Sequence, residues 1–403
     1  MPLVRRVMLG LALLLLALTG CGGGGATPPT NRTRGTLISS ASVASYSREL
    51  IEAALRSQGL TQLLPVQYGV RYYRITYATI DTAGNPTTAS GLIAAPTGAV
   101  GARPLLSYQH GTIVRRSDAP SNPQARESQM VGAGAAAVGY VVAAADYLGL
   151  GQGAGLHPFL HAASEATACV DMLRATRQFC LGRSLQLSNS LFLAGYSQGG
   201  HATMALHRAL EADYAGEFTV TACAPMAGPY DLSGTSFPQA LSNPSSATSY
   251  YAAYLLVAYN SVYSLFSSLS EVFASPYDTR IATLFDGTHS SSEIMAQLPA
   301  NPSDMLTPGF LSRMQAASPT DPFLNALREN DVYDWRPLTP VRLYHGHADR
   351  DVPYANSEVA YARMSALGAD VQLLNVGDSL DHETAIMPSL LGARTWFGTF
   401  TTP

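Results

Sequence analysis

Short apolar runs alternate with helical stretches over most of the chain, and this alternation most narrows the folds that the chain can adopt. Each run is short for a helix and suits a parallel strand that is buried on both faces. The runs are residues 104–108, 140–145, 190–194, 218–224, 341–344 and 371–376, and the clearest helical patterns are residues 162–178 and 201–211. Alternating strands and helices predict an α/β fold with a mostly parallel central sheet and helices on both faces.

Two segments depart from this alternation. Before it, residues 47–57 predict a short helix, and residues 70–81 and 87–95 predict two strands joined by a turn. Within it, residues 233–338 are rich in Ser, Tyr, Pro and Ala and contain no convincing buried strand. We interpret this segment as an inserted, mainly helical cap, so that the core consists of residues 43–232 and 339–403.

The N-terminus has the pattern of an export signal. Arg5 and Arg6 precede an apolar stretch, residues 9–18, that is too short to span a bilayer. Residues Leu18-Thr19-Gly20-Cys21 follow and resemble a bacterial lipobox. The resemblance implies a lipoprotein signal peptide over residues 1–20, which is cut before Cys21, and acylation of that cysteine.

The expected location follows from this signal. Residues 21–42 are rich in Gly, Thr, Pro and Ser and predict a flexible tether. We therefore expect an extracytoplasmic lipoprotein that is anchored to a membrane, with plain secretion as the alternative. Gly22 after the cysteine suggests the outer membrane if the host is Gram-negative.

Composition excludes several kinds of chemistry. All 24 basic side chains are arginine, so a Schiff base, a Ser-Lys dyad and a P-loop lysine are excluded. The net charge of −4 offers no basic surface for nucleic acid. After the signal, Cys169, Cys180 and Cys223 remain. They could form one disulfide plus a thiol, or stay as three thiols.

A G-x-S-x-G element marks the candidate nucleophile. Gly195-Tyr196-Ser197-Gln198-Gly199 follows the apolar run 191–194 and precedes a helical stretch. A strand, a sharp turn and a helix in this order are typical of the nucleophile elbow of α/β-hydrolases. The flanking glycines let strand and helix approach closely, and the turn presents the Ser197 hydroxyl above the sheet.

The acid and the base should follow the serine in the order of that fold. Asp349 lies in the turn that follows the strand at 341–344. The residues around it closely match the G-x-x-D-x-x-V-P element that carries the acid in many α/β-hydrolases. Asp351 is its rival. His382 is the only histidine after Asp349 and is therefore the expected base. His345 and His347 have the spacing of a metal pair, but no third ligand lies nearby, and we predict no metal.

A reaction at a carbonyl also needs two backbone donors for the oxyanion. The N–H group of Gln198, which follows the nucleophile, is the first. Two loops compete for the second donor. One is His110-Gly111-Thr112, which resembles the His-Gly oxyanion loop of many esterases. The other begins at Asp146, directly after the strand at 140–145.

The segment from Gly139 to Gly149, which contains Asp146, resembles the strand-plus-Asp element of secretory lipases similar to fungal lipase A. That family shares the α/β-hydrolase core, a large helical cap inserted late in the chain, and hydrolysis of carboxylic esters. The resemblance covers most of the chain after residue 70 and favours Asp146 over Thr112 as the second donor. The sequence departs from the fungal pattern at Gln198, where the fungal enzymes commonly have Gly.

These elements predict a serine esterase or lipase that works through a Ser197 acyl-enzyme, without a cofactor, on a small-molecule or lipid ester. A serine peptidase or aminopeptidase of the same fold, or a non-catalytic surface binding protein, are the alternatives. Apolar residues of the cap could either pack inward or bind an acyl chain. These are Tyr250, Tyr251, Tyr254, Leu255, Leu256, Tyr259, Val262, Tyr263, Leu265 and Phe266.

Overall fold

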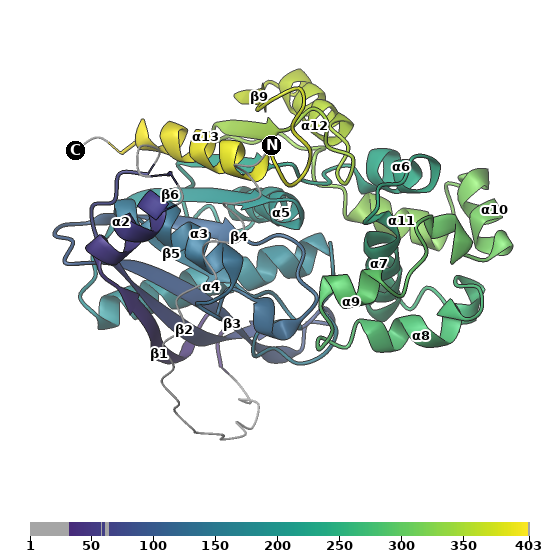
Figure 1. Cartoon of the computed structure of the whole chain (residues 1–403), viewed down its shortest axis with the longest axis horizontal. Helices are drawn as coiled ribbons and strands as arrows, with labels where there is room; N and C mark the ends of the chain where they lie inside the picture. The colour runs from purple at the N-terminus through teal and green to yellow at the C-terminus, as the bar shows by residue number, and fades with distance from the viewer. Residues whose placement is uncertain (1–31, 58, 61–63, 402–403) are drawn as a thin grey trace.

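A single mixed sheet organises the molecule, which we describe from a computed structural model of residues 32–57, 59–60 and 64–401 (Figure 1). The strand order is β1-β2-β3-β5-β4-β6-β7-β8-β9. Strands β1, β2, β3 and β5 pair antiparallel, and all pairs from β5 to β9 are parallel. The strands are β1 (Leu37–Tyr46), β2 (Gly69–Ile80), β3 (Pro86–Thr97), β4 (Arg103–Gln109), β5 (Val141–Ala145), β6 (Leu187–Tyr196), β7 (Ala222–Met226), β8 (Val341–His345) and β9 (Val371–Asn375).

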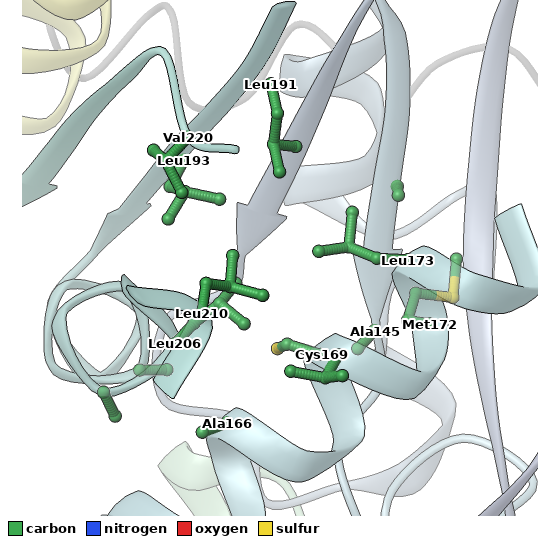
Figure 2. Packing of buried hydrophobic residues seen from close by; sticks show 14 of the residues in the cluster. Ala145, Ala166, Cys169, Met172, Leu173, Leu191, Leu193, Leu206, Leu210 and Val220 are labelled. Carbon is green, nitrogen blue, oxygen red and sulfur yellow. The ribbon is translucent and has the colours of Figure 1, made fainter. Parts of the chain in front are cut away.

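The central strands are buried on both faces, as the apolar runs predicted. In β6, Leu191 and Leu193 belong to one hydrophobic cluster, and Phe192 and Ala194 belong to another on the opposite face. Figure 2 shows the first cluster, in which both leucines lie near side chains of the helices that follow β5 and β6. Because both faces are covered, the strands lack the polar alternation of a half-exposed sheet.

Helices cover the two faces. The first cluster includes residues of α4 (Ala162–Gly182), α5 (Gln198–Ala212) and α12 (Ala355–Ala366). The second includes residues of α2 (Arg48–Ser57), α3 (Arg126–Gly134) and α13 (Ile386–Gly398). The predicted α/β fold is therefore confirmed.

The chain between β7 and β8 forms a helical insertion with a hydrophobic core of its own (green in Figure 1). Its α-helices are α6 (Phe237–Ser242), α7 (Thr248–Tyr263), α8 (Tyr277–Leu284), α9 (Ser291–Met295), α10 (Pro308–Ala316) and α11 (Pro322–Glu329). Helix α7 is central, and its buried residues include Tyr254, Leu256 and Tyr259. The insertion lies at the end of the sheet where the parallel strands finish (Figure 1).

The tether expected over residues 21–42 ends earlier than predicted, because residues 37–42 belong to a strand. Leu37–Tyr46 forms the edge strand β1, paired with β2 over its whole length. The strand could not be predicted from its serine-rich sequence, because an edge strand with one solvated face tolerates small polar residues. Leu37 and Tyr46 still pack against the two sheet clusters.

The expected signal peptide and Cys21 lie outside the described residues. Within the described part of the chain, no helix has the length and apolar character needed to cross a bilayer.

Candidate active site

Ser197 occupies a strained turn between β6 and α5. Its backbone angles are φ 62° and ψ −124°, which residues other than glycine rarely adopt. The Ser197 N–H group donates to the carbonyl oxygen of Met226 at the end of β7, over 2.9 Å. This bond to the neighbouring strand holds the turn in place. The strained backbone conformation of Ser197 costs about 1–3 kcal/mol.

The two flanking glycines are required by close backbone contacts. A Cβ atom on Gly195 would collide with the carbonyl oxygen of Gly199, and one on Gly199 would collide with that of Gln109. Strand β6, helix α5 and the end of β4 therefore meet without room for a side chain. This geometry explains the G-x-S-x-G spacing.

The structure brings the three predicted triad residues together. His382 Nε2 lies 2.8 Å from Ser197 Oγ, and His382 Nδ1 lies 2.6 Å from Asp349 Oδ2. All three residues are buried. The Tyr196 hydroxyl donates to the His382 carbonyl oxygen over 2.7 Å and so fixes the backbone of the loop that carries the imidazole.

Asp349 is held by several donors. Its Oδ1 atom accepts the backbone N–H groups of Asp351 and Val352 over 3.0 and 2.9 Å, and His345 Nε2 lies 3.1 Å from its Oδ2. Burial alone raises the pKa of Asp349, but the charge of His382 and the hydrogen bonds from His345 and His382 outweigh burial and lower the pKa to about 2. Asp349 is therefore ionised at neutral pH, and the rival Asp351 contributes its backbone.

The same pairing acts on the imidazole. Burial lowers the pKa of His382, but the neighbouring Asp349 carboxylate more than compensates, so this pKa is raised above its ordinary value of 6.5. A raised pKa makes the imidazole a stronger base toward the Ser197 hydroxyl.

The two expected oxyanion donors fare differently. Gln198 is the first residue of α5, so its N–H group has no acceptor within the helix. The Asp146 N–H group donates to the carbonyl oxygen of Ser90 on the neighbouring strand, over 2.9 Å. Asp146 as second donor is therefore contradicted. Its side chain is also fully buried, and it accepts from the Ser121 N–H group over 2.7 Å.

The alternative loop lies beside the serine. A Cβ atom on Gly111 would lie 3.8 Å from Ser197 Cβ, which places this backbone next to the nucleophile. The Gly111 N–H group donates to the Glu127 carboxylate over 3.0 Å, and His110 Nε2 lies 3.2 Å from the Asp146 carbonyl oxygen. These bonds fix the loop and leave the Thr112 N–H group without a partner among the described residues.

Two pockets meet at Ser197, and both are also lined by Thr112 and Tyr251. We name them the apolar cleft, with about 730 Å³ of empty space, and the polar cleft, with about 1340 Å³. Side chains lining the apolar cleft include Phe159, Leu160, Leu232, Phe237, Leu255 and Val352. Those lining the polar cleft include Arg115, Asp118, Asn122, Arg126, Glu127 and Glu383.

The apolar residues of helix α7 both pack inward and line a cleft. Tyr251, Ala252 and Leu255 line the apolar cleft, whereas Tyr254 and Tyr259 are buried in the core of the insertion. The apolar residues of this helix therefore serve both purposes on different faces.

The remaining candidates form no second centre. Cys169, Cys180 and Cys223 are free and buried, and burial raises the pKa of all three thiols, to about 12 for Cys180. His345 contacts Asp349, and the rings of His347 and Tyr354 lie 4.9 Å apart. Among the described residues, no group of three or more His, Cys, Asp or Glu could hold a metal ion.

Sequence reasoning missed three supports of the site. These are the Met226 carbonyl that holds Ser197, the His345 ring beside Asp349, and the Glu127 carboxylate on Gly111. His345 lies four positions before Asp349 in the sequence, but its spacing from His347 is that of a metal pair and does not indicate the contact with Asp349. Nothing in the sequence near Glu127 indicates its contact.

Comparisons with known proteins agree with this geometry. A family model described as secretory lipase matches residues 124–398. A proposed hydrolase from Legionella pneumophila is 33% identical, with a TM-score of 0.85, over 90% of this chain and 98% of that one. The rice cell wall degrading esterase LipA from Xanthomonas oryzae is 32% identical, with a TM-score of 0.82, over 91% and 97%.

A more distant structure shares the fold alone. Candida antarctica lipase A is 18% identical, with a TM-score of 0.67, over 92% of this chain and 84% of that one. A search of curated proteins gives no match. The family match and the two closer similarities show that the chain belongs to the secretory lipase family of α/β-hydrolases and is a carboxylic ester hydrolase.

Proposed function

We propose that this protein is a lipid-anchored serine esterase or lipase in which Ser197, His382 and Asp349 form the catalytic triad. The observation that carries the proposal is the continuous hydrogen-bonded path from Ser197 Oγ through His382 to Asp349, at the meeting point of the two clefts. No cofactor is needed for this chemistry.

The reaction has two steps. His382 Nε2 takes the proton of Ser197 as Oγ attacks the ester carbonyl carbon, and it then gives that proton to the departing alcohol. Water attacks the resulting acyl-enzyme in the second step, with His382 again as the base. Asp349 keeps the imidazole in the required tautomer and stabilises its cation.

The oxyanion needs two donors in each step. We assign them to the backbone N–H groups of Gln198 and Thr112. Gln198 N–H points out of the first turn of α5, and Thr112 follows the loop that Glu127 and His110 hold beside Ser197.

The two clefts suit the two halves of an ester. An acyl chain fits the apolar cleft, where each buried methylene contributes about 0.8 kcal/mol before ordering costs. The charged and amide side chains of the polar cleft suit a hydroxyl-rich alcohol. The similar esterase from Xanthomonas oryzae is described as degrading rice cell walls, and this description agrees with an ester of a hydroxyl-rich alcohol.

A substrate screen tests the function. We expect hydrolysis of p-nitrophenyl esters by the wild type, none by Ser197→Ala, and little hydrolysis of aminoacyl-anilides. Faster cleavage of the anilides would instead support a peptidase of the same fold. Equal ester hydrolysis by wild type and Ser197→Ala would remove the proposed nucleophile.

The anchor rests on the lipobox-like residues Leu18 to Cys21. We expect radiolabelled palmitate to enter the wild type in a bacterial host and to be absent from Cys21→Ser, which should appear in the soluble fraction. A wild-type protein without label would leave secretion by an ordinary signal peptide.

A further inference from the structure

The Gln198 side chain is tied into a buried polar network that the reaction does not use directly. Gln198 is buried, and its amide nitrogen lies 2.8 Å from Glu165 Oε1 and 2.7 Å from His157 Nε2. Its amide oxygen has no partner among the described residues. Both bonds therefore come from the NH₂ group, and the two acceptors alone orient the side chain.

The tautomer of His157 follows from its neighbours. Its Nδ1 atom lies 2.8 Å from the carbonyl oxygen of Leu148, so Nδ1 carries the hydrogen and Nε2 accepts from Gln198. This neutral form agrees with burial, which lowers the pKa of His157 to about 4.

Glu165 connects Gln198 to a second histidine. The Glu165 side chain is fully buried, and its Oε2 atom lies 2.7 Å from His201 Nδ1. His201 Nε2 lies 2.8 Å from the carbonyl oxygen of Asn330. His201 therefore faces an oxygen atom on both sides, one from the Glu165 carboxyl group and one from the Asn330 backbone.

Asn330 extends the network into the helical insertion. It directly follows α11, and its side-chain nitrogen donates to the Tyr263 hydroxyl at the end of α7 over 2.7 Å. Its side-chain oxygen accepts from Ala162 N over 2.8 Å, at the start of the helix that carries Glu165. Hydrogen bonds thus connect Gln198 to α7 through Glu165, His201 and Asn330, whose backbone contacts His201 and whose side chain contacts Tyr263.

We propose that Glu165 and His201 are positioning residues, which hold Gln198 so that its backbone N–H group points at the oxyanion. Through Asn330, they also couple the orientation of this N–H group to the position of the helical insertion. This inference rests on the oxyanion role proposed for Gln198. A donor that shifts by a fraction of an ångström stabilises the transition state less, while the substrate in its ground state is bound as before.

Three variants test this positioning role. Glu165→Leu removes the acceptor, Gln198→Met removes the donor while keeping the backbone N–H group, and Glu165→Gln keeps an oxygen for Gln198 and a donor for His201. Loss of a whole oxyanion donor costs about 10²–10³-fold in kcat, so we expect the first two to lose about 10–100-fold, with KM changed by less than about 3-fold. Glu165→Gln should stay within about 3-fold of wild type.

A transition-state analogue separates positioning from general damage. Ser197 Oγ adds to the carbonyl carbon of an alkyl trifluoromethyl ketone, the Ser197 proton passes to His382, and the carbonyl oxygen becomes the oxyanion. The inhibition constant should therefore rise by the factor by which kcat/KM falls. Asn330→Ala should move both quantities in the same direction, by a smaller factor. Tyr250→Phe is the control, since Tyr250 is buried in the insertion outside this path.

Full activity and unchanged inhibition in folded Glu165→Leu or Gln198→Met would overturn the proposal, as would a fall in kcat with an unchanged inhibition constant. If Glu165→Leu does not fold, Gln198→Met decides alone. Hydrolysis that persists in Ser197→Ala is a separate result and would refute the triad instead.

Discussion

His382 Nε2 lies 2.8 Å from the Oγ atom of Ser197, although the two residues are 185 positions apart in the chain. The serine ends a strained turn beside the centre of the sheet, and the histidine comes from the loop after β9. The contact therefore depends on the parallel pairing of the strands from β6 to β9.

The acid of the triad makes the first prediction. Asp349→Asn should lower kcat by about 10⁴-fold, because an amide favours the wrong tautomer of His382 and cannot stabilise its cation. The matched control is Asp351→Asn, which keeps the backbone N–H group that Asp349 accepts. Steady-state hydrolysis of a p-nitrophenyl ester measures both. A larger loss in Asp351→Asn would show that the acid has been misassigned.

The pH dependence follows from the raised pKa of His382. The imidazole must be neutral to act as the base, so activity is lost as pH falls through this pKa. We expect kcat/KM to rise with pH through a midpoint above 6.5. His289→Gln, which replaces a half-buried histidine on the insertion, should leave the midpoint unchanged. A midpoint well below 6.5 would contradict the pairing with Asp349.

The sequence predicted those parts of the fold that repeat a local pattern. Runs such as 190–194 are apolar on both faces because β6 is covered on both faces, and the glycines at 195 and 199 report a backbone collision that any side chain would cause. The order of Ser197, Asp349 and His382 then followed from the connectivity of such a sheet.

Contacts between distant segments could not be predicted in the same way. The Asp146 N–H group is occupied because β3 pairs with β5 and places the Ser90 carbonyl beside it, and strand register is invisible in the run of alanines before Asp146. Likewise, the serines of β1 are typical of a tether until β2 supplies the backbone partners.

The lining of the apolar cleft predicts acyl-chain preference. We expect kcat/KM to rise from acetate to at least octanoate, because longer chains bury more methylenes against Leu255 and its neighbours. Ala252→Phe, which adds bulk inside the cleft, should reduce octanoate hydrolysis more than acetate hydrolysis.

A control on the same helix separates filling from damage. Val257→Phe also introduces an aromatic ring, at a half-buried position outside the residues that line the cleft, and it should preserve the chain-length profile. A wild-type profile that peaks at acetate and falls steadily would place the acyl chain elsewhere.

The strained turn predicts a trade of stability for activity. Glycine adopts φ 62° without penalty, so Ser197→Gly should be more stable than Ser197→Ala by about 1 kcal/mol, after the entropy cost of glycine. Urea denaturation of the two inactive variants measures the difference. A less stable Ser197→Gly would show that the turn is not strained.

Covalent labelling identifies the nucleophile of this hydrolase. A fluorophosphonate forms a stable bond with an activated serine, and intact-protein and peptide mass spectrometry locate the adduct. We predict one adduct per molecule, on Ser197, with slow labelling in His382→Ala and none in Ser197→Ala. Stoichiometric labelling of Ser197→Ala, or an adduct on another residue of the wild type, would contradict the assignment of Ser197 as the nucleophile.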